Sequence, residues 1–505
     1  MAQYDLLTEP WLQCAMLDGT VQPKGLCEIL AQAHEIKEVA EPSPLVTFGA
    51  YRLLLAIVHW LRPMKTVNEW RQAWQAGRFD QAFLAELAER GKGCFDLFAD
   101  TNRFYQHAEG GASKTRKGVA YLAYEFPTET YITHFCHVHD DQHASCPACC
   151  AGGLIALSAF ATQGGAGHYA SINGTPPLYV LPCGPTLFHT LLVNLPIGEL
   201  ADVWPEGHST DVPAWLRSRG DYRGEGPVGL LEGLTWQPRR AYLYPDDTEG
   251  TCTCCGRTST ILVRQMGYAP HGDTRGSAEE RRAWADPHVP LRAKDDRPVT
   301  PGDEPSTWAK RVRSMLCAPR SGETVPPPAL RQLARLAACG AIPADTHLRT
   351  AHFAAVAKKA TVASWSRQEW HTPAQFLTNQ DLASAIAEQL DHAEDLADQV
   401  TQAVTRGLTN RNARRAARKE ALQALDSFHA KAEQAFREAL ADMATKGAAP
   451  DDALATVAQR LHEAALATYD RLRLKRPMAE RWQRGRQRAF FDRAATQLLS
   501  KGGTP

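Results

Sequence analysis

The chain has 505 residues, with 56 basic and 56 acidic side chains and therefore a formal net charge of zero. This length allows about two to four domains with sizeable cores. The neutral balance excludes a strongly basic footprint over the whole protein, so any nucleic-acid contact must come from a local patch or depend on a partner. The first residues lack the basic and apolar regions of a secretory signal, and the thirteen cysteines are an odd number. We therefore expect a cytoplasmic protein with reduced thiols and no disulfide framework.

The first 130 residues mix short apolar stretches with helical patterns. Asp5 to Trp11 is expected to form an opening strand and turn. Apolar residues spaced three and four apart predict amphipathic helices over 45–61 and 68–84. The most apolar run, 51–61, is far shorter than a membrane span and contains two ionisable side chains, so it predicts a buried helix and no membrane contact.

From about 130 to 265 the sequence is richer in loops and strands. Short β-type runs at 178–182 and 241–244 are bounded by Gly and Pro. The next stretch, 268–328, is rich in Gly, Pro, Asp and Arg. We expect it to be an exposed insertion or a long functional loop that contributes little to the core.

A hairpin is predicted between residues 354 and 365, after a helical segment over 329–339. Two short β-type arms there flank Lys358 and Lys359. We expect the hairpin to present these two ammonium groups at its tip.

Beyond Asn379 the composition changes to Ala, Leu, Glu, Gln and Arg with apolar residues at helical spacing. Thr378 or Asn379 is the natural N-cap of the first helix, the second ends at Gly447, the third runs from about 451 to 472, and a fourth follows Pro477. Four long helices with short connections predict an antiparallel four-helix bundle. The expected architecture is α+β, with a large mixed N-terminal domain over residues 1–377 and a C-terminal bundle over residues 378–505.

Two cysteine pairs with CxxC spacing, Cys146/Cys149 and Cys252/Cys255, bracket a glycine-rich loop and the run Gly-Leu-Thr-Trp-Gln-Pro-Arg-Arg. Each pair can hold one ion with two thiolates from a single turn, and two pairs complete a closed tetrahedral site. Such a site has no open position for substrate, so we predict a structural Zn²⁺ that joins two distant segments. Scattered buried thiols and a redox pair are the alternatives.

The glycine-rich loop contains Gly164, Gly165 and Gly167 and is followed by Asn173-Gly174. Glycines let a backbone approach a phosphate or a groove edge closely. The loop is not a Walker A motif, because no Gly-Lys-Ser/Thr follows, so nucleotide hydrolysis is not expected. An ordinary flexible loop is the alternative.

Two polar regions have more than one interpretation. The His- and Asp-rich run from Phe135 to His143 can be a second metal site, a nucleic-acid contact or a solvated loop. The basic residues between Arg406 and Lys419 can contact phosphates or form a solvated helix face.

An alternative function follows from His107-Ala-Glu109, which with the first cysteine pair resembles the HxE and CxxC elements of zinc deaminases, with Glu109 as proton shuttle. Pro147 lies between the two cysteines, whereas the deaminase signature has Pro before the first. The second pair is also left unexplained. A stand-alone zinc-dependent deaminase or hydrolase is therefore the alternative, and a helical scaffold that binds only proteins is a third.

Taken in order, the motifs resemble the large subunit, CasA, of the type I-E CRISPR surveillance complex Cascade. The resemblance covers essentially the whole chain. It rests on the opening from Tyr4 to Trp11, the first cysteine pair with the glycine loop and Asn173 to Pro176, the run from Gly233 to Arg239, the second cysteine pair, and the terminal bundle.

The resemblance implies a non-catalytic subunit that reads the short protospacer-adjacent motif in double-stranded DNA, mainly from the minor groove, and helps to open the duplex. It also implies four partners: other Cascade subunits, the CRISPR guide RNA, double-stranded target DNA, and a helicase-nuclease that the subunit helps to recruit.

The resemblance further implies site residues. The glycine loop supplies Gly164, Gly165 and Gly167 for DNA, and Phe135 and His137 fall in the loop that contacts the guide-RNA 5′ region and backbone subunits. The hairpin with Lys358 and Lys359 corresponds to the duplex-splitting wedge, where familiar members carry amide side chains, so phosphate or base contact by lysine is our hypothesis. The family's basic finger corresponds to Arg275 when counted back from Trp284, and to Pro270 when counted forward from Cys255.

Overall fold

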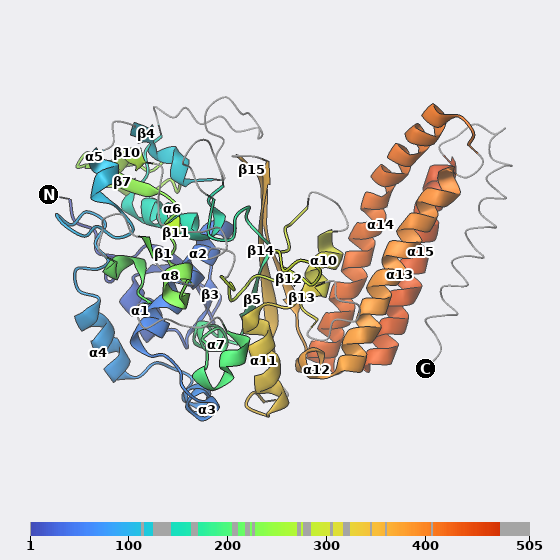
Figure 1. Ribbon diagram of the computed structural model, residues 1–505, viewed down its shortest axis with the longest axis horizontal. Coiled ribbons are helices and arrows are strands. Elements are labelled where there is room, and N and C mark those ends of the chain that lie inside the picture. Colours follow the sequence, from blue (N-terminus) through green and yellow to red (C-terminus); the bar gives the residue numbers. More distant parts are fainter. Residues whose placement is uncertain are drawn as a thin grey trace.

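The computed structural model describes a series of segments that together hold most of the chain. In this structure a mixed body of helices and small sheets is followed by a group of long helices, with the hairpin of β14 and β15 between them (Figure 1). The described residues are 2–112, 116–124, 143–162, 170–204, 211–217, 223–224, 228–269, 274–275, 284–302, 307–316, 324–343, 346–358, 361–405 and 408–474.

The helices and strands follow one another in an irregular α/β order. The first half has β1 (Leu12–Met16), β2 (Val21–Lys24), α1 (Leu26–Ala31), β3 (Ile36–Val39), α2 (Pro44–Leu61), α3 (Val67–Ala76), α4 (Gln81–Arg90), α5 (Ala108–Ala112), β4 (Arg116–Gly118), η1 (Val119–Leu122), α6 (Pro147–Phe160), β5 (Tyr179–Cys183), α7 (Leu187–Val193), η3 (Gly198–Val203), η4 (Ala214–Leu216), β6 (Arg223–Gly224) and α8 (Leu230–Leu234). The second half has β7 (Arg240–Asp246), β8 (Gly250–Thr251), β9 (Thr258–Ser259), β10 (Leu262–Ala269), β11 (Thr274–Arg275), β12 (Leu291–Arg292), α10 (Thr307–Arg313), β13 (Thr324–Val325), α11 (Pro328–Ala338), β14 (Arg349–Lys358), β15 (Thr361–His371), α12 (Ala374–Thr378), α13 (Gln380–Thr405), α14 (Arg411–Lys446) and α15 (Pro450–Leu474).

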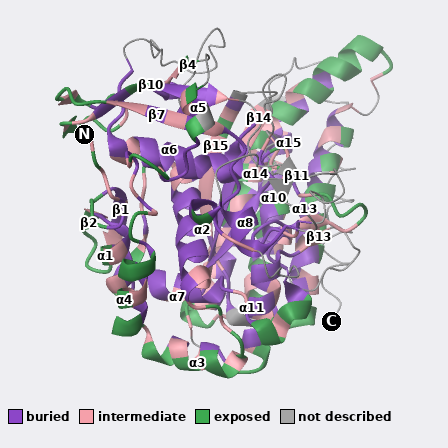
Figure 2. Cartoon of the chain, turned by 60° about the vertical axis from the view of Figure 1, so that its left-hand side comes forward, coloured by how far each residue is buried: buried purple, intermediate pink, exposed green. Residues whose placement is uncertain are grey.

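Helices α2 and α6 form the centre of the mixed body, and both are mostly buried (Figure 2). Helix α2 begins after Ser43, whose side chain accepts a hydrogen bond from the Val46 amide, with Pro44 at the first helical position. The two helices come very close at Gly49, where a Cβ atom would lie 2.9 Å from the backbone of Ile155. By length and composition α2 is apolar enough to cross a membrane, but 78% of it is buried inside the protein. The predicted buried helix is confirmed.

The predicted hairpin is confirmed and is longer than its sequence signal. Strands β14 and β15 pair antiparallel from Arg349 opposite His371 to Lys358 opposite Thr361. Strand β5 pairs with the first half of β14 only, from Arg349 to Phe353. The distal half of the hairpin therefore extends beyond the strand that supports its base.

Three long helices, α13, α14 and α15, pack against one another at the C-terminal side (Figure 1). The Asn379 side chain accepts from the amides of Asp381 and Leu382, so it caps α13 as predicted. Helix α14 ends at Gly447, whose φ of 64° is the left-handed conformation that glycine adopts most easily. The fourth predicted helix, after Pro477, lies outside the described residues.

Three sequence expectations for secondary structure and burial were wrong. The single helix over 68–84 is two helices, because Gly77 with φ 68° ends α3 and the Asp80 carboxylate caps α4. The turn expected after Asp5 is present at residues 6–8, but the opening strand begins only at Leu12, and Asp5 forms an isolated bridge. The stretch 268–328 supplies core side chains to the described parts of the chain, including Trp284, Asp286, Trp308, Val312 and Met315.

Candidate functional site

The two cysteine pairs lie on two elements that meet at the edge of the mixed body. Cys146 is the N-cap of α6 and Cys149 lies in its first turn, while Cys252 and Cys255 lie in the turn between β8 and β9. Backbone hydrogen bonds join the elements, since the Thr253 amide donates to the Ala144 carbonyl at 2.7 Å, and Ser145 exchanges both of its hydrogen bonds with Val263 of the adjoining β10 at 2.9 and 2.8 Å. The long sequence separation between the pairs is therefore closed by the fold itself.

The four sulfur atoms form a compact group whose members all lie within 4.8 Å of one another. The Cys146 and Cys255 sulfurs are 3.8 Å apart, and the Cys149 and Cys252 sulfurs are 3.7 Å apart. A tetrahedral Zn²⁺ with Zn–S distances of about 2.3 Å requires sulfurs about 3.8 Å apart, whereas a disulfide bond is about 2.05 Å long. The predicted grouping of these residues is confirmed, and its geometry fits a closed four-thiolate metal site.

A fifth cysteine next to this group was missed by the sequence interpretation. The Cys254 sulfur lies 3.3 Å from His143 Nε2 and 3.4 Å from the Ser145 hydroxyl. His143 is buried and belongs to the His- and Asp-rich run, so it packs beneath the four-thiol group without being part of it. The CxxC spacing had selected Cys255 and not Cys254, and the structure groups the same residue with the other three thiols.

The deaminase alternative required His107 to join the first cysteine pair. Instead, His107 Nε2 lies 2.7 Å from Gln237 Oε1, and both residues are buried. In the part of the chain that the structure describes, the group of side chains that could bind a metal ion consists of four thiols and contains no histidine. A site with one histidine, two cysteines and an open position is thus not the one these residues form.

The glycine loop residues Gly164, Gly165 and Gly167 lie outside the described residues, but both ends of the loop are described. The Ser171 amide donates to the Ala161 carbonyl at 2.9 Å, which holds the two ends together. Thr162 and Ser171 are both buried. The residues that flank the loop, 161–162 and 170–171, are therefore held close together, and we call them the neck of the loop.

The run from Gly233 to Arg239 contacts both α2 and this neck, and we call it the floor of the glycine loop. The Gly233 carbonyl accepts from Arg52 Nη2, and the Thr162 carbonyl accepts from Arg239 Nη2, each at 2.7 Å. Gly233 is required sterically, because a Cβ atom there would lie 2.3 Å from the Trp284 ring. The motif that the sequence singled out thus acts as a structural support whose side chains and carbonyls hold α2 and the loop neck.

A buried polar network links this floor to the other end of the loop. Arg52 Nη1 donates to the Asp286 carboxylate at 2.7 Å, and Asn173 Nδ2 donates to the same oxygen at 2.9 Å. Burial raises the pKa of Asp286, but the charge of Arg52 and the hydrogen bonds from the His288 amide and Asn173 outweigh burial and hold it below its usual value. Burial lowers the pKa of His288 to about 4. Both groups therefore keep a fixed charge state near neutral pH.

The remaining predicted contact residues stay predictions. Arg275 lies in β11, which pairs in parallel with β6, and its side chain is not among those described. Lys358 ends β14, and its side chain also lies outside the description, as do Lys359, Phe135 and His137. The basic residues at the start of α14 are exposed.

Comparisons with known proteins identify the family. Residues 5–468 match the family model described as CRISPR-associated protein Cse1 (CRISPR_cse1). The CRISPR-associated protein CasA/Cse1 of Thermus thermophilus is 29% identical over 288 residues, which are 54% of this chain and 52% of that protein. The chain thus spans about half the length of the curated relative that it matches.

Solved structures have the same fold. The crystal structure of Cse1 from Acidimicrobium ferrooxidans gives a TM-score of 0.79 at 22% identity, covering 100% of both chains. A chain from a structure titled "CRISPR RNA-guided surveillance complex" gives 0.72 at 18% identity, again covering 100% of both. Because the family model matches nearly the whole chain, this protein belongs to the CRISPR-associated Cse1 family, also called CasA, as its motifs had indicated.

Proposed function

We propose that the chain is the large subunit of a type I-E Cascade complex. In that complex it recognises the protospacer-adjacent motif in double-stranded DNA, promotes duplex opening and R-loop formation, and helps to recruit the helicase-nuclease. The observation that carries the proposal is the family match over residues 5–468. Its partners are the other Cascade subunits, the guide RNA, target DNA and the helicase-nuclease, and the likeness to a chain of an RNA-guided surveillance complex supports the first two.

The proposal includes a structural role for metal and a non-catalytic role for the chain. Cys146, Cys149, Cys252 and Cys255 would hold one Zn²⁺, which would neutralise their thiolates and fix the turn between β8 and β9 on α6. A four-thiolate site leaves no open position for water activation. None of the eleven cysteines that the structure describes is joined in a disulfide bond, which suits a reducing cytoplasm.

We also propose a domain boundary near residue 377 and an antiparallel four-helix bundle beyond it. The three described helices have two short connections, 406–410 and 447–449, which suits antiparallel neighbours. The fourth helix would follow Pro477 and cover the remaining apolar face.

The mechanism follows from groove chemistry and from the shape of the hairpin. The minor groove carries a degenerate pattern of donors and acceptors, so a glycine backbone and one cationic side chain would give permissive motif recognition, while guide pairing supplies sequence specificity. The distal half of β14 and β15 extends beyond β5. This extension would place Lys358 and Lys359 against the end of the opening duplex.

The experiment that tests this function is an add-back. Guide-RNA complex that lacks this subunit is mixed with guide-matched duplexes that differ only in the adjacent motif, with and without the purified chain. Tight binding that is restored only on motif-bearing DNA supports the proposal. If the chain has no effect on the binding of either duplex, the proposal is contradicted, and a scaffold that binds only proteins is favoured.

The first prediction concerns the hairpin tip. Replacing Lys358 and Lys359 together by Ala is expected to slow duplex opening, since two phosphate contacts would be lost, and to reduce the slope of log affinity against log salt by about 1.8, or 0.9 per contact. Assembly with the other subunits should not change. Opening is measured by the fluorescence of a base analogue next to the motif, and affinity by titration at several salt concentrations.

The matched control removes two positive charges from an exposed surface elsewhere. Lys65 and Lys92 are exposed and lie outside both the hairpin and the basic run of α14, and replacing both by Ala should leave the opening rate and the salt slope unchanged. Equal loss of opening and assembly in the hairpin variant would count against a wedge.

A further inference from the structure

A hydrogen-bonded cluster, buried except for one half-buried tyrosine, joins the ends of two segments that the proposed function assigns to different partners. Its members are Tyr124, Thr162, Arg239 and Tyr268, which we call the loop junction. Tyr124 immediately precedes residues 125–142, which contain Phe135 and His137. Thr162 immediately precedes residues 163–169, which contain the three loop glycines.

Arg239 is the centre of the loop junction. Arg239 is 4% exposed, and its guanidinium donates to the Thr162 carbonyl at 2.7 Å and to the Pro238 carbonyl at 3.0 Å. It also hydrogen-bonds to the Tyr268 hydroxyl. A charged group with so little contact with water needs its hydrogen bonds satisfied by the protein, so Arg239 constrains each carbonyl it holds.

Tyr124 connects the same point to the other segment. Its hydroxyl hydrogen-bonds to the Thr162 backbone and to Tyr268. Burial holds the pKa of Tyr124 well above its usual value, so the hydroxyl keeps its proton at physiological pH. Thr162 is therefore held on its carbonyl by Arg239 and elsewhere on its backbone by the residue that precedes segment 125–142.

The neck of the glycine loop makes this arrangement stiff. The Ser171 amide donates to the Ala161 carbonyl at 2.9 Å, and Asn173 is tied to the buried Asp286. A shift of Tyr124 cannot be absorbed by fraying of the neck without breaking buried hydrogen bonds and leaving their polar groups unsatisfied.

We propose that Tyr124, Arg239 and Tyr268 are positioning residues that couple docking on the guide complex to recognition of the motif. The inference rests on the proposed function of the two segments. When segment 125–142 is fixed by the guide complex, Tyr124 is fixed, and through Thr162 the root of the glycine loop is held in its DNA-binding position. By thermodynamic linkage, motif-bearing DNA must then tighten the binding of the chain to the guide complex by the same factor.

The test measures this coupling factor directly. The affinity of the chain for the guide complex that lacks it is titrated with and without a short motif-bearing duplex, in the wild type and in Tyr124→Phe. Coupling between two sites is typically about 5- to 150-fold. We expect a factor in this range for the wild type and a factor close to 1 for Tyr124→Phe, with its affinity in the absence of DNA unchanged.

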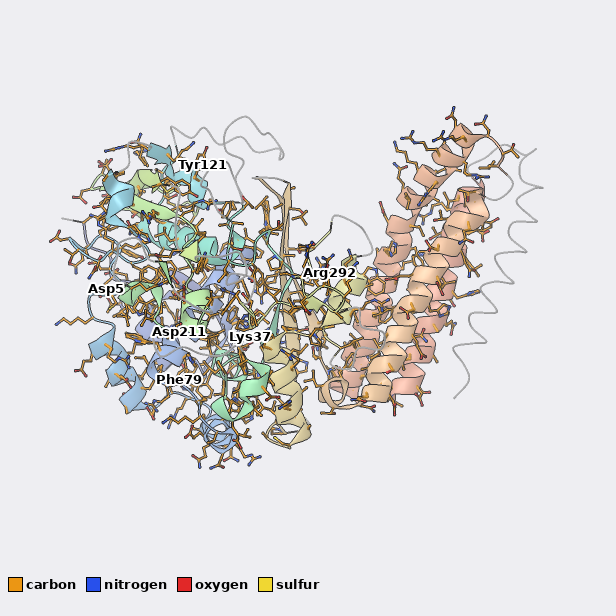
Figure 3. All side chains as sticks on the ribbon, viewed as in Figure 1. Asp5, Lys37, Phe79, Tyr121, Asp211 and Arg292 are labelled. Atoms are coloured by element: carbon orange, nitrogen blue, oxygen red, sulfur yellow. The ribbon has the colours of Figure 1, made fainter. Side chains whose placement is uncertain are left out.

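The matched control is Tyr121→Phe, three residues away and labelled in Figure 3. The Tyr121 hydroxyl accepts from Lys117 Nζ at 3.2 Å. The chemical change is the same as in Tyr124→Phe, but it removes a hydroxyl that bonds to Lys117, outside the loop junction. The wild-type coupling factor should therefore be retained. Folding of Tyr124→Phe is checked by circular dichroism. If it does not fold, the coupling factor is measured in Tyr268→Phe, which removes a second hydroxyl of the loop junction.

The outcomes distinguish failure of the proposed function from failure of the coupling inference that rests on it. A wild-type chain without motif-dependent binding would overturn the proposed function. If the wild type discriminates motifs but Tyr124→Phe and Tyr268→Phe keep the full coupling factor, the loop junction does not couple the segments. A variant that loses affinity equally with and without DNA has an unchanged factor, which also overturns the inference and indicates a role in stability alone.

Discussion

Replacing Cys252 by Ser is expected to abolish zinc binding and to lower the free energy of unfolding by about 3 kcal/mol or more. The Cys252 sulfur is fully buried, accepts a hydrogen bond from the Cys146 amide at 3.2 Å and lies 3.7 Å from the Cys149 sulfur. The binding free energy of a structural Zn²⁺, about 10–16 kcal/mol in small peptides, is part of the folding free energy. Only part of it would be lost here, because backbone hydrogen bonds also join the two elements. Zinc per chain is measured by mass spectrometry, and stability by urea unfolding.

The neighbouring Cys254 provides the control. Its sulfur contacts His143 and Ser145 and lies outside the four-thiol group. Cys254→Ser should therefore keep one zinc per chain and nearly wild-type stability, whereas Cys255→Ser should lose the metal. Full zinc content in Cys252→Ser would refute the closed site, and loss of zinc in Cys254→Ser would show that the wrong cysteine had been assigned.

Features encoded by local spacing were predictable from the sequence. The cysteine pairs, the cap at Asn379 and the hairpin around Lys358 each depend on residues within a few positions of one another. Local physical chemistry determines such features, because a turn, a cap or a pair of thiolates has few ways to form. The two cysteine pairs also predicted a long-range contact, since each pair alone supplies only half of a tetrahedral site.

Features that depend on tertiary context were not predictable in the same way. Asp286 lies in a stretch whose composition is typical of an exposed loop, yet it is buried and pairs with a residue 234 positions earlier. The available signal was Arg52 itself, a cation inside the most apolar run of the chain, which needs a buried partner. Gly77 was a similar signal, because a glycine inside a helical pattern often marks its end.

The role of the run from Gly233 to Arg239 became visible only through its contacts. Glycine at 233, the amide of Gln237 and the guanidinium of Arg239 are unremarkable as residue types. Their partners, Trp284, His107 and Thr162, are spread over almost 180 positions. A motif of this kind can be recognised in the sequence, but whether it binds a ligand or supports a loop depends on which residues the fold brings to it.

Replacing Arg52 by Met is expected to lower the free energy of unfolding by about 3–5 kcal/mol, the usual cost of leaving one partner of a buried ion pair alone. Arg52 is 1% exposed and also donates to the Gly233 carbonyl at 2.7 Å and the Leu234 carbonyl at 3.4 Å. Met has a similar length, so the loss comes mainly from the uncompensated Asp286 carboxylate and the two carbonyls. Chemical unfolding at pH 7 measures the effect.

The pH dependence gives this prediction a signature that a packing defect would not have. In the wild type the folded pKa of Asp286 is depressed, so its contribution is present above the unfolded value of about 3.9 and is lost as the pH falls below it. Without Arg52, burial raises the pKa of Asp286, and the destabilising charge is neutralised as the pH falls from 7 towards 4. The gap in stability between wild type and Arg52→Met should therefore narrow on acidification.

Arg62 offers the comparison that decides whether burial is the cause. It lies at the C-terminal end of the same helix and pairs with Asp80 at 3.3 Å, but the two side chains are 43% and 62% exposed. An exposed pair contributes about 0–1 kcal/mol, so Arg62→Met should cost little, and its effect should not grow or shrink markedly between pH 7 and 5. If Arg52→Met costs no more than Arg62→Met, the buried network does not hold α2 to the floor of the glycine loop. The neck of that loop would then depend on Arg239, on Tyr124 and on the Ser171–Ala161 hydrogen bond.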